Sequence, residues 1–366
     1  MPQEKLYQIA LHLTNGLGSV LIRHLIAHFG SAKSIFEANL KTLTRVPGVG
    51  EATARVILQK EGLKEAEIEL KKLENTDVKL FFYTDAEYPQ RLKSLYDAPV
   101  LLYGKGNLNF NHGRFVGVVG TRKSTDYGKN VTEQIVEGLA GKDTTIVSGL
   151  AYGIDIAAHR ACLKHHVSTI GVMATGADVI YPATHAKTSQ EMQSNGGILT
   201  EYSLGTKPDF MRFPARNRII AGLSDAIIVV EAAEKGGALI TAEFANNYNR
   251  DVFAVPGNLS SSYSTGCNKL IRSHKAQIFT GVDDLLESLS WLPEHSKNSV
   301  QSAALPEHFT QEESQIVSLL RQKGEMNIDD LTWESKIMAG KLATLLLNLE
   351  LQGYVRVLPG KRFALA

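Results

Sequence analysis

The chain has 366 residues, of which 43% are hydrophobic and 21% charged, a composition typical of a soluble globular protein with two or three domains. With 39 basic and 38 acidic residues the net charge is +1, so a nucleic-acid surface must be a local patch rather than a property of the whole chain. No stretch approaches the roughly 20 apolar residues of a membrane span, and no signal-peptide pattern opens the chain. Cys162 and Cys267 match no metal spacing. We expect a cytoplasmic protein with two buried free thiols and no membrane contact.

Residues 1–75 are predicted to form a small helical domain. Apolar residues recur there at helical spacing, beginning at Leu6 and Ile9. The stretch LTRVPGVGEATARVIL (43–58) places two glycines before an apolar helix, and residues 15–31 repeat this form more weakly. The stretch resembles a helix-hairpin-helix, whose exposed amides at a helix start can hold a phosphate. A plain turn between two helices of a small bundle explains the same residues equally well.

Residues 76–290 alternate strand-like and helix-like stretches. Several strands are continuous runs of β-branched and aromatic residues, which is typical of strands buried on both faces of a parallel sheet. The pattern predicts an α/β domain with an extended Rossmann-like parallel sheet and helices on both faces. The predicted strands are VKLFFY, RFVGVVG, TTIVSG, STIGVMA, GILTE, AIIVVEA and DVFAVPG.

Residues 291–309 are rich in polar and small residues and are predicted to be a linker. Thr310 follows as a helix N-cap, with two glutamates in the first turn. Three short helices, QEESQIVSLL, NIDDLTWES and about IMAGKLATLLLNLEL, precede two strand-like arms around Pro359-Gly360. This order of elements predicts a winged helix over residues 310–366.

The third helix of a winged helix commonly enters the major groove of DNA. The charge of this one is modest, which favours a weak DNA or protein contact over sequence-specific binding of duplex DNA. The candidate cations are Lys336, Lys341, Arg356, Lys361 and Arg362.

Glycine-rich loops follow three of the predicted strands. They are Gly120-Thr121-Arg122-Lys123-Ser124, Ser148-Gly149-Leu150-Ala151 and Thr175-Gly176-Ala177-Asp178. Because ligands of open parallel sheets bind at the carboxyl ends of the strands, three such loops favour an anion site over turns that need glycine for geometry alone. None has the form G-x-G-x-x-G or the Walker form, so neither a nicotinamide dinucleotide nor ATP hydrolysis is supported, and we expect no cofactor.

A cationic segment with interleaved phenylalanines follows at residues 207–218. Cations neutralise the phosphates of a nucleic-acid backbone and aromatic side chains stack on bases, so the combination favours binding of a single strand. Lys207, Phe210 and Arg212 are the favoured contacts.

The same segment also has a structural interpretation. Its arginines could pair with Glu201 and Glu231 while its phenylalanines fill the core. Arg216 and Arg218 are predicted to open the helix NRIIAGLS and to point in different directions, so we assign both roles to them.

Three carboxylates near strand ends or helix starts, Glu201, Glu231 and Glu243, are candidate catalytic groups. No histidine pairs with them by motif, and the sequence holds no Ser/His/Asp arrangement and no metal-ligand cluster. We therefore assign no catalytic residue and no metal site.

Taken in order, these motifs resemble the DNA-processing protein A (DprA/Smf) family. The helical N-terminal region and the winged helix are also similar to those of its longer members. The matching stretches are VVGTRKSTDYG (118–128), SGLAYGIDIAAH (148–159), TGADVIYP (175–182), TEYSLGTKP (200–208), FPARNRIIAGLS (213–224), VVEAAEKGGALITAEFA (229–245), AVPG (254–257) and GCNKLI (266–271).

The resemblance implies a Rossmann fold that homodimerises and binds single-stranded DNA, without established catalytic turnover. It further implies interaction with RecA, which is loaded onto the incoming strands of natural transformation. In the family the arginine of the first glycine-rich loop grips a phosphate, which here is Arg122. The Lys-x-x-Phe pair of the family's DNA pocket corresponds to Lys207 and Phe210.

The predicted DNA- or phosphate-binding residues lie in the loops and the cationic segment. They are Gly120, Thr121, Arg122, Lys123, Ser148, Gly149, Lys207, Phe210, Arg212, Arg216, Asn217, Arg218, Gly236 and Gly237.

Two other functions stay open. Residues 236–243 are loosely similar to a segment of Rossmann-like nucleotide phosphoribohydrolases, which would make Glu243 a catalytic carboxylate and Arg122 or Arg218 a phosphate clamp. The second is a regulator that binds duplex DNA through the winged helix.

Overall fold

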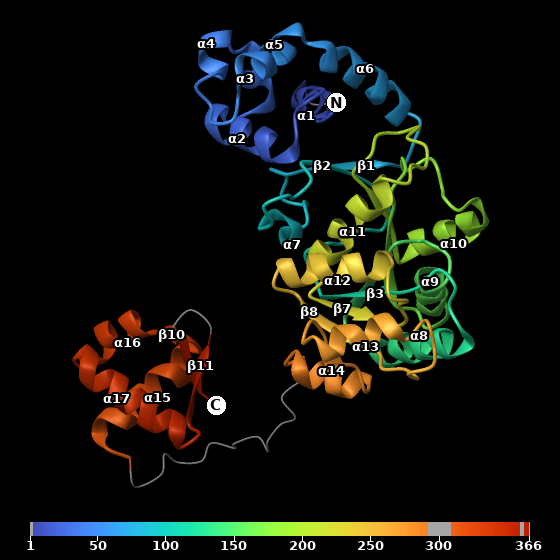
Figure 1. Ribbon diagram of the computed structural model, residues 1–366. Helices are drawn as coiled ribbons and strands as arrows, with labels where there is room; N and C mark the ends of the chain where they lie inside the picture. Colours follow the sequence, from blue (N-terminus) through green and yellow to red (C-terminus); the bar gives the residue numbers. More distant parts are fainter. Residues whose placement is uncertain (1–2, 292–308, 359–361, 366) are drawn as a thin grey trace. The chain divides into compact units, whose positions relative to one another are not determined.

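The computed structural model describes residues 3–291, 309–358 and 362–365 (Figure 1). The chain divides into two compact units, Met1–Trp291 and Leu292–Ala366, each with its own hydrophobic core. Most of the predicted linker, residues 292–308, lies outside the described residues.

Six helices open the first unit, as expected for residues 1–75. Side chains cap two of them: Ser31 accepts a hydrogen bond from the amide of Ser34, and Asn39 forms a capping box with Thr42. Before the fifth helix Gly48 has a φ of 86°, which favours glycine. The helices are α1 (Gln3–Leu13), α2 (Ser19–Phe29), α3 (Ala32–Glu37), α4 (Leu40–Leu43), α5 (Glu51–Gln59) and α6 (Glu61–Leu73).

A nine-stranded sheet lies at the centre of the first unit, in the order β1-β2-β6-β5-β4-β3-β7-β8-β9. The strands from β6 to β9 pair in parallel, whereas β2 is antiparallel to both β1 and β6. The strands are β1 (Lys79–Phe82), β2 (Leu101–Gly106), β3 (Arg114–Val119), β4 (Thr144–Ser148), β5 (Ser168–Val172), β6 (Gly196–Thr200), β7 (Ala226–Val229), β8 (Asp251–Ala254) and β9 (Gln277–Ile278).

The direction of the chain across the sheet reverses between β3 and β7. Helices connect β3 to β4 and β4 to β5 in one direction, and the chain then crosses back from β6 to β7 and continues to β8. Because such crossovers are right-handed, the two sets of helices cover opposite faces, with α8 and α9 on one and α11 and α12 on the other (Figure 1). The helices after β1 are α7 (Gln90–Lys93), α8 (Asp126–Leu139), α9 (Ile154–Lys164), α10 (Ala186–Glu191), α11 (Arg212–Leu223), α12 (Gly237–Asn247), α13 (Thr265–Arg272) and α14 (Val282–Ser288), with short 3-10 turns at Ala183–His185 and Met192–Ser194.

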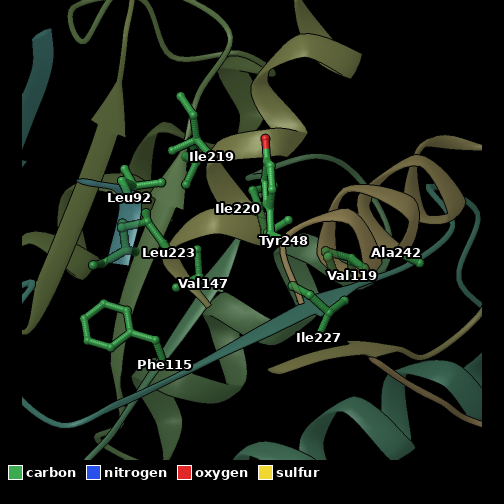
Figure 2. Packing of buried hydrophobic residues seen from close by; sticks show 14 of the residues in the cluster. Leu92, Phe115, Val119, Val147, Ile219, Ile220, Leu223, Ile227, Ala242 and Tyr248 are labelled. Atoms are coloured by element: carbon green, nitrogen blue, oxygen red, sulfur yellow. The ribbon is translucent and has the colours of Figure 1, made fainter. Parts of the chain in front are cut away.

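The main core lies between the sheet and the α11–α12 face. Figure 2 shows Val119 and Val147 of the strands packed with Ile220 of α11 and Ala242 of α12, all of them buried. This burial explains why the strands read as continuous apolar runs, and it confirms the predicted extended Rossmann-like α/β class.

All seven strands predicted for residues 76–290 form, and the sequence pattern missed two of the nine strands of this sheet. β2, with the sequence LLYGKG, contains glycine and lysine, and β9 is only two residues long. Neither segment has a strong local preference for strand structure. Hydrogen bonds to neighbouring strands hold both in the sheet.

The N-terminal helices pack against the β1–β2 edge of the sheet. Their apolar side chains form one cluster with Phe82, Leu101 and Tyr103 of these strands and with Leu204 after β6. The buried carboxylate of Glu69 in α6 also accepts a 2.6 Å hydrogen bond from the amide of Leu204. Residues on both sides of position 75 thus belong to one compact unit, and a domain division there stays a prediction.

The second unit is the predicted winged helix. Thr310 and Glu313 form the capping box of its first helix, and a three-stranded sheet of order β10-β12-β11 closes its core. Pro359, Gly360 and Lys361 of the wing lie outside the described residues. The elements are α15 (Gln311–Lys323), β10 (Met326–Asn327), α16 (Ile328–Ser335), α17 (Ala339–Leu351), β11 (Val355–Leu358) and β12 (Arg362–Leu365).

Within the described ranges, no helix is long and apolar enough to cross a membrane. The same residues contain no group of three or more His, Cys, Asp or Glu side chains placed to hold a metal ion. Cys162 and Cys267 are buried free thiols.

Candidate nucleic-acid interface

A cavity of about 730 Å³ opens at the carboxyl ends of the central strands, beside the point where the strand order reverses. This is the position at which open α/β sheets bind their ligands. Its walls come from the loops after β3, β4 and β7 and from the first turns of α11 and α12. They include Gly120, Thr121, Arg122, Ala151, Asp155, Phe210, Phe213, Arg216, Asn217, Glu234, Lys235, Gly236, Gly237 and Glu243.

The loop after β3 carries Arg122, one of two exposed cations that line the cavity among the described residues, the other being Lys235. A side chain at Gly120 would place its Cβ 2.4 Å from Ile154, so only glycine lets the loop approach α9 this closely. Backbone bonds fix the next residue, because Thr121 donates to the carbonyl of Glu231 and accepts from the amide of Ile154. Arg122 is exposed, with its guanidinium 5.3 Å from the centre of the Phe213 ring. No carboxylate among the described residues lies within ion-pair distance of it.

A second wall is the N-terminus of α12. Gly236 and Gly237 line the cavity, and no side chain caps this helix. The unpaired amides of a first helical turn and the helix dipole favour a negative group at such a place. Arg122 and the start of α12 therefore offer positive charge from two sides of one cavity.

Arg216 lies at the floor and is almost completely buried. It donates to the carbonyls of Gly149 and Val172 and, through Nε, to Oδ1 of Asn217. Burial lowers its pKa to about 10, and burial also raises the pKa of Asp155, while the charge of each acts on the other in the opposite sense. The structure thus places Arg216 and Asn217 at the cavity, and contacts within the fold hold the arginine side chain.

The cationic segment begins α11 earlier than predicted. The helix begins at Arg212 rather than near Arg216, so the predicted helix start was wrong. Pro214 would break a helix in its interior. In α11 it lies in the first turn, where backbone N–H groups have no partner within the helix, so the missing N–H of proline removes no hydrogen bond. Phe210 precedes the helix, lines the cavity and is 81% exposed.

Several predicted site residues do not line this cavity. Ser148 is fully buried and donates to the carbonyl of Val118, and Gly149 packs beside Asp155 and Arg216. Lys123 and Lys207 are exposed and Arg212 is half-buried, and Arg212 donates to the carbonyl of Lys207.

Arg218 turns away from the cavity and forms an ion pair with Glu201, as the structural interpretation of the segment predicted. The predicted pairing with Glu231 was wrong. The Glu231 carboxylate instead accepts hydrogen bonds from the amide and hydroxyl of Thr125, the N-cap of α8. Of the three candidate carboxylates, Glu243 is the one that lines the cavity.

The residue-by-residue predictions missed Asp155 and the segment from Ala232 to Lys235. The signal for Asp155 was present in SGLAYGID, where an acid follows the glycine-rich loop at the start of a helix. The segment after β7 carries one acid and one base in succession, Glu234 and Lys235, which is no distinctive binding pattern, and only the strand order brings it next to the Arg122 loop.

These features define a class: a Rossmann-like protein with an anion-binding cavity at its topological switch point, flanked by helix-hairpin-helix and winged-helix modules. Residues 79–290 match the family described as DNA recombination-mediator protein A, residues 300–361 match the DprA winged helix domain, and residues 12–60 match a SAM-like helix-hairpin-helix tandem. The chain belongs to the DNA-processing protein A (DprA/Smf) family.

Curated relatives agree with this assignment. The protein Smf of Synechocystis is 38% identical over 295 residues, which is 79% of this chain and 74% of that protein. The DNA processing protein DprA of Streptococcus pneumoniae is 44% identical over 207 residues, 57% of this chain and 73% of that protein.

Solved structures show the same fold. The X-ray structure of DprA from Streptococcus pneumoniae has a TM-score of 0.68 and 36% identity, and the match covers 77% of this chain and 97% of that chain. A structure that concerns the single-stranded DNA binding mode of DNA processing protein A from Helicobacter pylori has a TM-score of 0.54 and 31% identity over 59% of this chain and 97% of that chain.

Proposed function

We propose that this protein binds single-stranded DNA in the switch-point cavity, protects DNA taken up in natural transformation and loads RecA onto it. The observation that carries the proposal is the meeting of exposed Arg122, the uncapped start of α12 and exposed Phe210 at one cavity. The single-stranded DNA binding mode named for the Helicobacter pylori relative supports it. We propose a homodimer as the working form, without catalytic turnover.

The proposal fits a single strand better than a duplex. Arg122 and the α12 amides can hold a phosphate, while Phe210 offers a ring face to a base. Base faces are accessible only when the strand is unpaired, because a duplex buries them in its stack. A cavity of about 730 Å³ is also concave enough to hold a nucleotide but not a double helix.

Equilibrium binding to fluorescent oligo-dT and to a matched duplex, over a salt series, tests the site. The variant Arg122→Ala, Lys235→Ala removes the two exposed cations that line the cavity among the described residues. It should lose affinity for oligo-dT, with the slope of log K against log salt reduced by about 0.7 for each phosphate that is no longer neutralised. Lys129→Ala, Lys187→Ala removes two exposed cations outside the cavity and is the matched control. Equal affinity of the two double variants, or a preference for duplex, would remove the cavity as the binding site.

RecA loading needs its own assay. The wild-type protein should speed formation of RecA filaments on oligo-dT already coated with single-strand-binding protein, and the cavity double variant should not. Mass photometry of the same samples tests the homodimer. Tight binding to oligo-dT without acceleration would contradict the loading role and leave DNA binding intact.

Glu243 supports a second candidate, a nucleotide hydrolase. It shares the cavity with Arg122 and with the Gly236-Gly237 helix start, which together could hold a nucleoside monophosphate. Incubation of each nucleoside monophosphate with wild type and with Glu243→Gln, followed by chromatography of the released base, decides this. Turnover in the wild type alone would favour the hydrolase, and equal traces in both would exclude it.

A further inference from the structure

Two half-exposed tyrosines lie just outside the Arg122 end of the cavity. Tyr152 and Tyr181 are 48% and 47% exposed. Tyr152 directly precedes Gly153, where an added Cβ would lie 2.1 Å from the carbonyl oxygen of Thr121, so its backbone abuts the Arg122 loop. Tyr181 packs on Phe213, the ring that the Arg122 guanidinium covers. Both tyrosines therefore border the positively charged wall.

Each tyrosine ring packs against another ring, which restricts its motion. The ring centres of Tyr181 and Phe213 are 5.7 Å apart, and those of Tyr152 and His185 are 5.0 Å apart at an edge-on angle of 72°. His185 is buried, with Nδ1 2.9 Å from the carbonyl oxygen of Leu150. A ring fixed on one side and open on the other can receive a flat partner without a large loss of side-chain entropy.

The tyrosines that support the fold of this unit look different. Tyr88 and Tyr103 are fully buried in the hydrophobic clusters of the sheet. Tyr152 and Tyr181 instead leave about half of their surface to solvent beside a cation. Aromatic rings next to backbone-binding cations are the arrangement by which proteins bind single strands without sequence preference.

We propose that Tyr152 and Tyr181 form a stacking platform for bases of the strand where it leaves the cavity past Arg122. The inference rests on the proposed function and extends it to these two residues. The cavity holds one part of the strand through phosphate and Phe210, and the platform holds neighbouring bases through their faces. The platform contacts only the faces of the bases and not their hydrogen-bonding edges, so it binds any sequence.

The test compares oligo-dT with an oligomer of the same length built of tetrahydrofuran abasic units, which keeps the phosphates and removes the bases. The wild-type protein should bind oligo-dT more tightly than the abasic oligomer. Tyr152→Ala and Tyr181→Ala should each weaken binding of oligo-dT by about tenfold, the effect of losing one stacked base, and should leave abasic binding and the salt slope unchanged. Tyr152→Phe and Tyr181→Phe keep the ring and should bind oligo-dT like the wild type.

Tyr96→Ala is the matched control, because Tyr96 is 66% exposed in the same unit but packs on Tyr248, which does not line the cavity. Thermal unfolding of every variant should match the wild type. The platform is overturned if Tyr152→Ala and Tyr181→Ala bind both oligomers as the wild type does, or if they weaken both equally. Failure of the wild type to bind either oligomer would instead overturn the proposed function itself.

Discussion

Arg122 and Arg216 belong to the same cavity but have opposite surroundings. Arg122 is exposed and rests on Phe213, whereas Arg216 is buried, bonded to two main-chain carbonyls and close to Asp155. A ligand can bind the exposed guanidinium of Arg122 without disturbing the fold. Arg216 holds the loop after β4 against α11, so its removal affects the protein before any ligand binds.

Arg216→Met should therefore destabilise the fold far more than Arg122→Ala. Methionine fills similar volume but removes the donor to the Gly149 and Val172 carbonyls and leaves the buried Asp155 carboxylate without its neighbouring positive charge, which costs about 3–5 kcal/mol. The exposed substitution should stay within about 0.5 kcal/mol. Urea unfolding of both variants measures the difference, and similar midpoints would show that Arg216 is not a structural cation.

His159 gives the fold a dependence on pH. It is fully buried, and its Nδ1 lies 2.8 Å from the Thr169 hydroxyl, which itself donates to the Ile146 carbonyl. The hydroxyl proton is thus used, so the histidine donates from Nδ1, and its Nε2 has no partner among the described residues. Burial, together with the nearby charges of His185 and Arg216, lowers the pKa of His159 to about 3 from its ordinary 6.5.

Between these two pKa values the unfolded chain holds more protons than the folded one, so stability should fall as the pH drops from about 6.5 toward 3. His159→Asn retains a donor toward Thr169 and cannot titrate, and it should flatten the decline of the unfolding free energy between about pH 7 and pH 5. His112→Asn changes an exposed histidine and should keep the wild-type slope. An unchanged slope in the His159→Asn variant would assign the acid sensitivity to other groups.

Much of the site was predictable at this scale, because glycines and cations at strand ends have a direct chemical meaning. Gly120, Arg122, Phe210 and Gly236 were predicted and meet at the cavity. Which of the cationic side chains would be buried could not be predicted from the residue types. Arg216 and Arg218 stand two apart in a cationic run, and only the packing of α11 sends one to the cavity floor and the other to Glu201.

Helix α9 shows how an element positions the Arg122 loop. Its N-cap, Gly153, has φ 80° and ψ −124°, and an added Cβ would lie 2.1 Å from the Thr121 carbonyl oxygen and 2.8 Å from Cα of Arg122. The start of the helix and the loop after β3 are thus in backbone contact. Any side chain at Gly153 must displace one of them.

Gly153→Ala should weaken binding of oligo-dT as well as stability, because the displaced loop carries Arg122. Gly141→Ala is the control: its φ is 72°, but nothing lies within 4 Å of the added Cβ. The Gly141→Ala variant should lose only the roughly 1–2 kcal/mol of stability that a left-handed alanine costs, and its affinity for oligo-dT should not change. Thermal unfolding and binding of both variants test this, and equal affinity would mean that the loop tolerates the displacement.

At the level of elements, the strands buried on both faces were the easiest to predict. β2 was missed because its apolar run is short and ends in Gly-Lys-Gly, and its place in the sheet is set by β1 and β6. The order in which strands pair is a long-range property that no window of sequence carries.

The whole molecule combines two compact units, and the charge of the second argues against a main role in DNA binding. Two of its cations are in ion pairs. Nζ of Lys341 in α17 lies 2.6 Å from Oε1 of Glu312, and Nη1 of Arg362 in the wing lies 2.6 Å from Oε1 of Glu325. The exposed residues of α17 also include Leu347 and Leu351, which suit an apolar contact better than a phosphate backbone.

Removal of residues 292–366 should therefore leave most of the affinity for oligo-dT, whereas a duplex-binding regulator would lose its DNA binding. The cut after Trp291 keeps the contact of that ring with Arg114. Binding of the truncated and full-length proteins to oligo-dT and duplex separates the two hypotheses, and a large loss of oligo-dT affinity on truncation would contradict the placement of the site in the first unit.

The cluster shared by the N-terminal helices and the sheet edge also sets an order of events during synthesis. The helices leave the ribosome first, but their core is completed by Leu101, Tyr103 and Leu204, which follow later in the chain. Until Leu204 has emerged, the helices can pack on one another, but the part of their shared cluster that meets the sheet edge is incomplete, so apolar side chains there stay open to other chains. We therefore expect the segment up to Leu204 to need protection from aggregation during synthesis until this edge of the sheet has formed.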